Sequence, residues 1–268
     1  MNKHDCFVHP HSQVHPQAQL DSGVYIGPDC CIGENVIIHK NTRLDAHVFI
    51  GGWTEIGREC HFFPFSSIGT EPQDVTYQGE KTLVKIGDKN VFREFITVHR
   101  GTIKGRKATA IGNNNYFMAY SHIAHDCRVG SETVFINGAT LGGHVEVQDF
   151  ATVGAFSGIH QFCRIGKFAY IGGFSVLTQD VVPFCRVAGS RPPLFYGVNA
   201  LGLRRKGVSK DRIRNIKGML KIIFHSNLTT RKAVEKIEKE FPQTKDREEF
   251  IQFIRVSERG ILKKASEE

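Results

Sequence analysis

A large apolar residue recurs at every sixth position along most of the chain, and this rhythm limits the folds open to it. The step runs from Val8 to Ile68, resumes from Ile86 to Val98, and continues one residue out of phase from 111 to 177. All 26 residues on it are Val, Ile, Leu or Phe, although only 40% of the chain is hydrophobic. A period of six does not match the 3.6-residue turn of an α-helix, so this region is not helical.

A second position, two residues before each large one, holds a small or β-branched side chain. Residues two apart on an extended chain share a face, so each hexad predicts a short strand with two inward residues. Such strands stack into a parallel β-helix. Glycine often follows the large residue, as in Ile56-Gly57, and we expect it to supply the positive φ of a turn. Five of the seven cysteines take the small inward position, whereas Cys31 and Cys185 have no assigned role: Cys6, Cys30, Cys60, Cys127 and Cys163.

Two interruptions and a change of period divide the chain. Residues 70–85 and 101–110 break the rhythm, and we expect them to be loops that leave the solenoid. The Pro- and Gly-rich residues 189–197 predict a linker. Beyond it, apolar residues at helical spacing predict three helices that begin after Ser209, after Thr229 and near Thr244. The predicted organisation is a β-helix over residues 1–190 and a small α-helical domain over residues 191–268.

Four strings carry a family resemblance: HIAHDCRVG (122–130), IHQFCRIG (159–166), TVHRGT (97–102) and GVNALGLRRKG (197–207). They resemble the UDP-N-acetylglucosamine O-acyltransferases of lipid A biosynthesis, within the hexapeptide-repeat acyltransferase superfamily. The resemblance implies a left-handed parallel β-helix with 18 residues per coil. It also implies transfer of an (R)-3-hydroxyacyl group from acyl carrier protein to the 3-OH of UDP-N-acetylglucosamine, by a homotrimer.

Histidines gather at one corner of such a solenoid. With 18 residues per coil, the hexads of Ile123, Leu141 and Ile159 lie above one another, about 4.8 Å apart. We expect their histidines, with two more from nearby hexads, to form a column outside the prism: His125, His144, His160, His122 and His99. Clustered histidines indicate proton transfer or a metal. Three functions therefore stay open, namely an acyltransferase, a metal-dependent hydratase like γ-class carbonic anhydrase, and a β-helical module without catalysis.

The resemblance implies a role for each candidate site residue. His125 is the general base, Asp126 orients it, and Gly143 in the Gly142-Gly143 turn offers a backbone donor to the oxyanion. Transfer is direct, with no metal and no cofactor beyond the phosphopantetheine arm of acyl carrier protein. Thr76 stands where the family often carries Lys, which leaves open whether N-acetylglucosamine or its 3-amino analogue is preferred. Substrate contacts are implied for ten residues: Gln73, Asp74, His99, His122, His144, His160, Gln161, Asn199, Arg205 and Lys206.

The formal net charge is +8, which admits nucleic acid, a membrane surface or an acidic protein as partner. No nucleic-acid-binding motif accompanies the basic run from Arg204 to Lys217, and the resemblance implies acyl carrier protein, which is acidic. The sequence contains no apolar run of about 18 residues, so no transmembrane segment is predicted. Residues 1–16 lack the apolar core of a signal peptide. We therefore expect a cytoplasmic enzyme.

Overall fold

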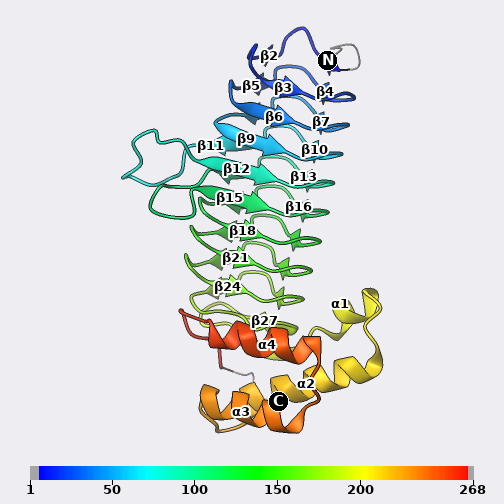
Figure 1. Cartoon of the computed structure of the whole chain (residues 1–268), viewed down its shortest axis with the longest axis vertical. Helices are drawn as coiled ribbons and strands as arrows, with labels where there is room; N and C mark the ends of the chain where they lie inside the picture. The colour runs from blue at the N-terminus through cyan, green and yellow to red at the C-terminus, as the bar shows by residue number, and fades with distance from the viewer. Residues whose placement is uncertain (1–5, 265–268) are drawn as a thin grey trace.

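The computed structural model describes residues 6–264 and forms a three-sided prism of short parallel strands followed by helices (Figure 1). The described part leaves out residues 1–5 and 265–268. The expectation that residues 1–16 hold no signal peptide therefore lies partly outside the described residues. The chain passes in turn through three sheets, called here sheets A, B and C, and the corners between them are the AB, BC and CA edges. The predicted left-handed parallel β-helix with an α-helical tail is confirmed.

The strands of each sheet follow the prism from its first coil to its last. Sheet A contains β1 (Phe7–Val8), β4 (Tyr25–Ile26), β7 (Arg43–Leu44), β10 (His61–Phe62), β13 (Val91–Phe92), β16 (Tyr116–Phe117), β19 (Val134–Phe135), β22 (Thr152–Val153), β25 (Tyr170–Ile171), β27 (Cys185–Ala188) and β28 (Leu194–Val198). Sheet B contains β2 (Gln13–Val14), β5 (Cys31–Ile32), β8 (Phe49–Ile50), β11 (Ser67–Thr70), β14 (Thr97–His99), β17 (His122–Ile123), β20 (Thr140–Leu141), β23 (Gly158–Ile159) and β26 (Val176–Leu177). Sheet C contains β3 (Gln19–Leu20), β6 (Val36–Ile38), β9 (Trp53–Ile56), β12 (Leu83–Ile86), β15 (Ala108–Ile111), β18 (Arg128–Val129), β21 (Glu146–Val147) and β24 (Arg164–Ile165).

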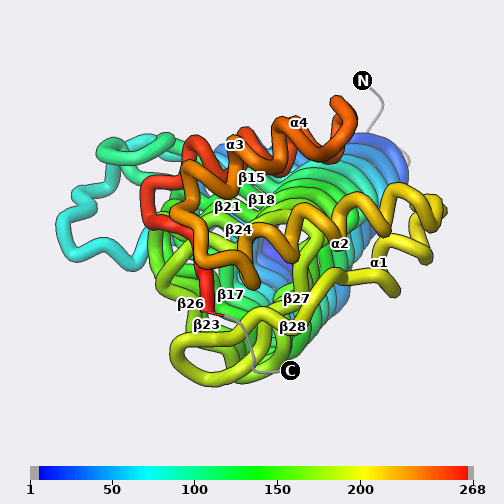
Figure 2. The backbone as a smooth tube through the Cα atoms, turned by 90° about the horizontal axis from the view of Figure 1, so that it is seen from below, coloured from blue at the N-terminus to red at the C-terminus, as the bar shows by residue number. Residues whose placement is uncertain are grey.

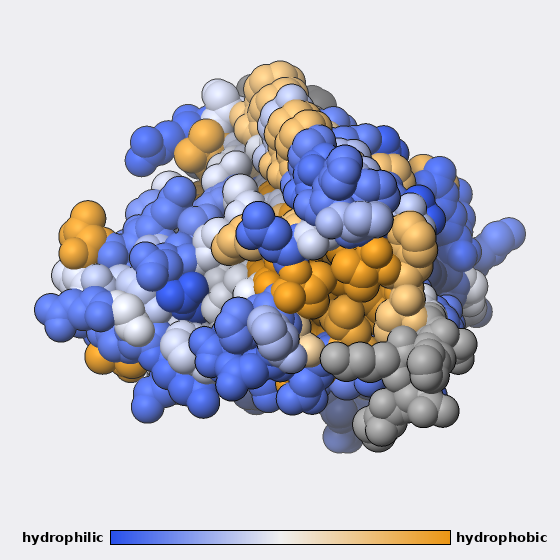
Figure 3. All heavy atoms as spheres, turned by 90° about the horizontal axis from the view of Figure 1, so that it is seen from above, coloured by the Kyte–Doolittle hydropathy of each residue, from blue (hydrophilic) through white to orange (hydrophobic). Residues whose placement is uncertain are grey.

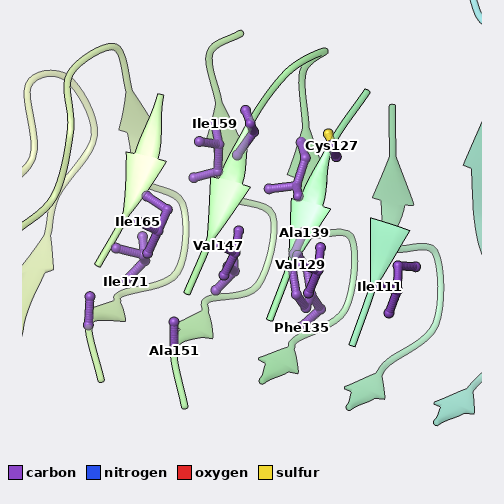
Figure 4. Close-up of a cluster of buried hydrophobic side chains, with 14 of the residues drawn as sticks. Ile111, Cys127, Val129, Phe135, Ala139, Val147, Ala151, Ile159, Ile165 and Ile171 are labelled. Carbon is purple, nitrogen blue, oxygen red and sulfur yellow. The ribbon is translucent and has the colours of Figure 1, made fainter. Parts of the chain in front are cut away.

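The large residue of each hexad points into the prism and stacks on its counterpart one coil later. The rings of Phe62, Phe92 and Phe117 stack with centroids 4.6 and 4.7 Å apart, close to the spacing of neighbouring strands. Figure 4 shows Val147 and Ile165 on successive coils of sheet C. Full burial of each such side chain contributes about 1.5–3 kcal/mol, so the core stabilises the prism along its whole length.

The cysteine predictions follow the same inward pattern. Cys30, Cys60, Cys127 and Cys163 are buried, and Cys6 is partly buried. Cys185 is buried as well, and Cys31 is exposed. At the N-terminal end the core lies open to solvent, and Figure 3 shows an apolar patch there, to which the first coil contributes.

Most corners contain one residue in the left-handed conformation, and this residue is seldom glycine. On the BC edge, Asp126, His144 and Phe162 have φ angles of 60°, 64° and 66°. The expectation that the glycine after each large residue supplies the positive φ is therefore wrong for most of these glycines, although Gly69, after Ile68, does have a φ of 75°. A Cβ on Gly57 would lie 2.5 Å from the carbonyl carbon of Gly87 on the next coil. Glycine is needed there because successive coils approach too closely for a side chain.

Two loops leave the BC edge, as predicted, and extend to the left in Figure 1. Residues 71–82 separate β11 from β12, and residues 100–107 separate β14 from β15. Both loops are shorter than predicted, because β12 begins at Leu83 and β15 at Ala108 and these strands pair with each other over four residues. The inward register resumes beyond each loop.

Four helices follow the prism within residues 6–264: α1 (Ala200–Arg205), α2 (Lys210–His225), α3 (Thr230–Glu240) and α4 (Lys245–Arg255). Ser209, Thr229 and Thr244 are the N-caps of α2, α3 and α4, and each side chain accepts a hydrogen bond from a backbone N–H of the first turn. The three predicted helix starts are confirmed. The short helix α1 was not predicted, because six residues are too few to display a periodicity.

The predicted linker is wrong over its second half. Strand β28 pairs antiparallel with β27, and its Phe195 stacks on Phe224 of α2 with ring centroids 3.8 Å apart. Helix α4 lies beside sheet C (Figure 2), where the guanidinium of Arg164 sits 4.5 Å from the ring of Phe253. The division of the chain at residue 190 stays a prediction. None of the helices between residues 6 and 264 has the length and apolar character needed to cross a membrane.

Candidate active site

The two loops pack against each other on the BC edge. Arg100, at the start of the second loop, donates two hydrogen bonds to the Tyr77 hydroxyl in the first, at 2.9 and 2.7 Å. Arg100 also donates to the carbonyl of Gly69 at 3.0 Å. Lys104 Nζ donates to Thr76 Oγ1 at 2.8 Å. The loops therefore form one wall beside the corner at which β17 passes into β18.

His125 and Asp126 form a hydrogen-bonded dyad at this corner. His125 Nδ1 lies 3.0 Å from Asp126 Oδ2, and the carboxylate is fully buried. The carboxylate also accepts hydrogen bonds from the N–H and hydroxyl of Thr102, at 3.0 and 2.8 Å, and from the N–H of Arg106 at 2.7 Å. Burial raises the pKa of Asp126, but the hydrogen bonds outweigh it and hold the pKa below its ordinary value. The carboxylate therefore stays ionised and orients the imidazole.

His125 Nε2 lies beside the backbone of Gly143 on the next coil. A Cβ on Gly143 would stand only 2.6 Å from this nitrogen. No described residue forms a hydrogen bond to Nε2, and with the Nδ1 proton donated to Asp126 this nitrogen carries the lone pair. The N–H of Gly143 also has no acceptor within residues 6–264, whereas the N–H of Gly142 donates to the carbonyl of Ile159 at 2.9 Å. Of the two glycines, only Gly143 keeps a donor free beside the base.

His144 and His160 lie around the same edge, but they do not form one column with His125. The rings of His144 and His125 meet edge to face with centroids 5.2 Å apart, and His144 stacks on Phe162 at 4.4 Å. His160 is exposed, with Nδ1 3.0 Å from the carbonyl of Gln161, which is also exposed. The predicted column is therefore only partly correct. The three histidines take three successive positions of the turn, so their side chains leave it in different directions.

His99 and His122 lie on sheet B just before the dyad. Their rings meet edge to face with centroids 5.2 Å apart. His122 Nδ1 is 2.7 Å from Thr97 Oγ1, and burial lowers the pKa of His122 from 6.5 to about 4. His99 Nδ1 hydrogen-bonds to the carbonyl of Glu71, and burial lowers the pKa of His99 too. Both imidazoles are therefore neutral at pH 7.

Asp74 lies in the first loop and its charge faces the dyad. Its Oδ1 accepts hydrogen bonds from Thr76 N at 2.9 Å and Thr76 Oγ1 at 2.8 Å. These bonds lower the pKa of Asp74, and the nearby charges of Lys104 and His125 lower it further. Gln73, next to it, is exposed. Thr76 stands where the family often carries Lys, but the second loop supplies a cation at the same place. The Lys104 ammonium donates a hydrogen bond to the Thr76 hydroxyl.

Asn199, Arg205 and Lys206 lie on the CA edge, apart from the dyad. The Asn199 side chain caps α1, and its Nδ2 donates to the carbonyl of Phe168 at 2.9 Å. Lys206 forms an ion pair with Glu132, and Arg205 is exposed. Glu132 and Phe168 both follow strands of sheet C, at the corner that leads into sheet A. A single chain therefore does not bring these three predicted residues to His125.

The dyad and His144 together offer three side chains of the kinds that bind metals. Ligand atoms of His125, Asp126 and His144 lie within 4.8 Å of one another. However, Asp126 Oδ2, the oxygen facing both imidazoles at 3.0 and 3.9 Å, already accepts the two hydrogen bonds from Thr102. A bound cation would have to displace them. The donor set therefore fits a hydrogen-bonded dyad better than a metal centre.

Cys127 follows the dyad directly but is turned away from it. Its side chain is fully buried, and Sγ lies 3.2 Å from the carbonyl of Gly142. Burial raises the pKa of Cys127 to about 12. A neutral thiol enclosed in the core cannot act as a nucleophile at neutral pH.

Thr102, Lys104 and Arg106 also lie at the site, although no role was predicted for them. They belong to the second loop, which was predicted without roles for its residues. The position of this loop could have indicated a role at the site, because the loop interrupts the repeat on the edge that carries the histidines. Gly105 lies so close that a Cβ there would be 2.5 Å from both Asp126 Oδ2 and His144 Cε1.

Comparison with known proteins identifies the family of the chain. Residues 180–262 match the family model described as "Udp N-acetylglucosamine O-acyltransferase; Domain 2", and residues 5–40 match bacterial transferase hexapeptide repeats. Proteins named acyl-[acyl-carrier-protein]–UDP-N-acetylglucosamine O-acyltransferase in Thermodesulfovibrio yellowstonii and Alkalilimnicola ehrlichii are 47% and 44% identical, and each match covers 96% of this chain and 99% of the relative.

Solved structures give the same result. The structure of LpxA from Acinetobacter baumannii is 40% identical with a TM-score of 0.93, covering 96% of this chain and 100% of that one. The UDP-N-acetylglucosamine acyltransferase of Arabidopsis is 32% identical with a TM-score of 0.84, over 96% of this chain and all of the other. The chain therefore belongs to the acyl-[acyl-carrier-protein]–UDP-N-acetylglucosamine O-acyltransferase family of hexapeptide-repeat enzymes.

Proposed function

We propose that the protein transfers an (R)-3-hydroxyacyl group from acyl carrier protein directly to the 3-OH of UDP-N-acetylglucosamine, the first step of lipid A biosynthesis. One observation carries the proposal. His125 is tied through Nδ1 to a buried carboxylate while Nε2 stays free beside the free N–H of Gly143. This arrangement provides a base and an oxyanion donor next to each other, as acyl transfer to a hydroxyl requires.

The chemical steps follow from these positions. Nε2 of His125 takes the proton of the sugar hydroxyl as its oxygen attacks the thioester carbonyl carbon. Asp126 stabilises the resulting imidazolium. The Gly143 N–H donates to the oxyanion of the tetrahedral intermediate. The carbon–sulfur bond then breaks, and the imidazolium returns its proton to the phosphopantetheine thiolate, which leaves an ester and free acyl carrier protein.

The remaining predicted residues surround this centre in the proposed complex. Asp74 and Gln73 bind the sugar from the first loop, with His99 and His122 as the wall of the groove. His144, His160 and Gln161 line the path of the sugar and the acyl-pantetheine arm. Transfer needs no metal and no further cofactor. The cytoplasmic location expected from the sequence stays a prediction.

We also propose that the active enzyme is a homotrimer with its sites between neighbouring chains. Substrate contacts are implied for Asn199, Arg205 and Lys206, which lie on the CA edge, and these residues reach a dyad on a BC edge only if they come from a second copy. In a threefold arrangement of that kind, sheet B of one chain faces sheet A of the next, and the three AB edges meet at the axis.

The surfaces of the prism support this arrangement. The AB edge carries a ridge of exposed, stacked rings, visible receding at the top of Figure 3: His47, Phe65, Phe95, Tyr120, Phe156 and Phe174. Apolar ridges of this kind are typical of interfaces. Sheet C, which would face outward, instead presents charged side chains on five strands: Glu55, Lys85, Arg128, Glu146 and Arg164.

Acyl carrier protein is the proposed donor, and the charge of the tail supports its docking there. Three members of the predicted basic run are paired with acids, namely Lys206, Arg212 and Arg214. The others, Arg204, Arg205, Lys210 and Lys217, form no ion pair within the described residues. Four free cations beside the prism would attract an acidic partner and favour its encounter with the site.

The test is an assay of purified protein with UDP-N-acetylglucosamine and a panel of 3-hydroxyacyl carrier proteins. We expect transfer by the wild type and a loss of about 10²–10⁴ in kcat for His125→Ala. His15, exposed on the same edge near the N-terminus, provides the control variant His15→Ala, with wild-type rates expected. Near-normal turnover by His125→Ala would remove the base assignment. Activity lost on chelation and restored by zinc would favour the metal-dependent alternative.

A further inference from the structure

Lys104 is held at the proposed active site by its neighbour in the chain. Gly105 packs against the dyad, where a Cβ would stand 2.5 Å from Asp126 Oδ2 and from His144 Cε1. Arg106, on the other side, donates its N–H to Asp126 Oδ1 at 2.7 Å. Lys104 therefore leaves the loop next to the dyad and is not on a free surface segment.

The ammonium of Lys104 is directed across the gap between the loops. Nζ donates to Thr76 Oγ1 at 2.8 Å, and that hydroxyl donates in turn to Asp74 Oδ1 at 2.8 Å. An ammonium has three donors, so two N–H groups of Lys104 remain available. No carboxylate of the described residues forms an ion pair with it, because Asp74 is reached only through Thr76.

The two arginines of the second loop, Arg100 and Arg106, are already engaged. Arg100 is nearly buried and bonds to Tyr77, to the carbonyl of Gly69 and to Glu71. The guanidinium of Arg106 donates to the carbonyl of Asp126 at 2.7 Å. Lys104, unlike these two arginines, is hydrogen-bonded across the gap between the loops and still has unused donors.

The charges at the site require such a group. Asp74 and Asp126 are both acids, and a nucleoside diphosphate sugar adds further negative charge when it binds. Like charges brought together in a partly desolvated groove repel unless a cation is placed among them. A sugar whose 3-OH reaches His125 Nε2 carries its diphosphate on C1 of the same ring, so the negative charge enters the site together with the reacting hydroxyl.

We infer that Lys104 binds a phosphate oxygen of the nucleotide sugar, with Thr76 holding its ammonium in place. This inference rests on the proposed function. Lys104 is thus a specificity-determining residue for a phosphate-bearing acceptor, supplied by the second loop. A hydrogen bond between charged partners accounts for roughly ten- to hundred-fold in affinity.

The experiment compares variants of the full chain by two measurements. For Lys104→Gln we expect the KM for UDP-N-acetylglucosamine and the Kd for UDP, measured by calorimetry without acyl donor, to rise roughly ten- to hundred-fold, with kcat within about threefold. Lys107→Gln is the matched control, because Lys107 is an exposed lysine of the same loop whose side chain has no partner among the described residues. It should leave both constants unchanged.

A charge swap separates recognition from loop damage. In Thr76→Lys/Lys104→Gln the ammonium returns to the same gap from the first loop, and we expect most of the lost affinity for UDP to be recovered. The inference is overturned if Lys104→Gln binds UDP as the wild type does, if it weakens UDP-N-acetylglucosamine but not UDP, or if the swap recovers nothing. A wild type that binds UDP tightly through Lys104 but transfers no acyl group would instead refute the proposed function alone.

Discussion

The substitution Asp126→Asn tests the dyad most directly, because it changes the charge and keeps the shape. Asp126 has a φ of 60°, a conformation that Asn also accepts, so the turn of the prism should persist. The carboxylate accepts four hydrogen bonds from described residues: two from Thr102, one from Arg106 N and one from His125. An amide offers one acceptor atom and places its NH2 against at least one buried N–H in either orientation.

Two magnitudes follow from this geometry. A buried donor left unpaired costs about 1–3 kcal/mol in the free energy of unfolding. With its NH2 in the place of Oδ2, the side-chain amide introduced by Asp126→Asn would also donate to His125 Nδ1, which moves the imidazole proton to Nε2 and removes the base, so kcat should fall by about 10²–10⁴-fold. The KM for UDP-N-acetylglucosamine should change little, since Asp126 is fully buried.

Steady-state kinetics at saturating substrate and urea unfolding measure the two effects separately. Thr102→Val is the matched control, because it removes one hydroxyl donor and leaves the carboxylate and the backbone N–H in place. It should lower kcat by about tenfold or less. A folded Asp126→Asn enzyme with kcat within threefold of the wild type would refute the view that this carboxylate sets the tautomer of His125.

Three further outcomes are expected. Gly143→Ala should remain folded but lose most activity, since its Cβ would stand 2.6 Å from Nε2 of His125; unchanged kcat would contradict the placement of the base. The pKa of buried His122 is about 4 against 6.5 when exposed, so the unfolded chain takes up the proton first as pH falls. Between pH 7.5 and 5, urea unfolding of the wild type should lose about 2 kcal/mol more than that of His122→Gln, and equal losses would disprove this. Mixed oligomers of His125→Ala and Arg205→Ala should regain about a quarter of the wild-type sites, whereas sites contained in single chains would regain none.

The fold was predictable because its information is repeated. Each coil repeats the same inward apolar residue, as at Ile32, Ile50 and Ile68, so the predicted fold does not depend on any single position. The same redundancy placed the inward cysteines correctly. What failed was local: the positive φ was assigned to Gly57, whereas the turns place it two residues later, at residues such as Glu59. Strand β28 was not predicted because it pairs antiparallel with β27 of the last coil and does not follow the six-residue repeat.

The candidate site was predictable only as far as the repeat extends into it. The register brought His99 and His125 to one edge despite the loop between them. It could not show that Thr102 and Arg106 turn back onto Asp126, because a loop outside the repeat has no periodic constraint on its path. Nor could the repeat show that Asn199 lies on another edge than the histidines, because Asn199 follows the last coil of the prism.

The two loops also have a consequence for how such enzymes diversify. Ile68 pairs with Val98 and Val98 with Ile123, so the coils above each detour continue as though nothing had been inserted. Because the strands pair in the same register on both sides of each loop, the length of a loop is independent of the stability of the β-helix. A change in the length or sequence of residues 71–82 and 100–107 would therefore alter the surroundings of the candidate site while the strand pairing of the coils stayed the same.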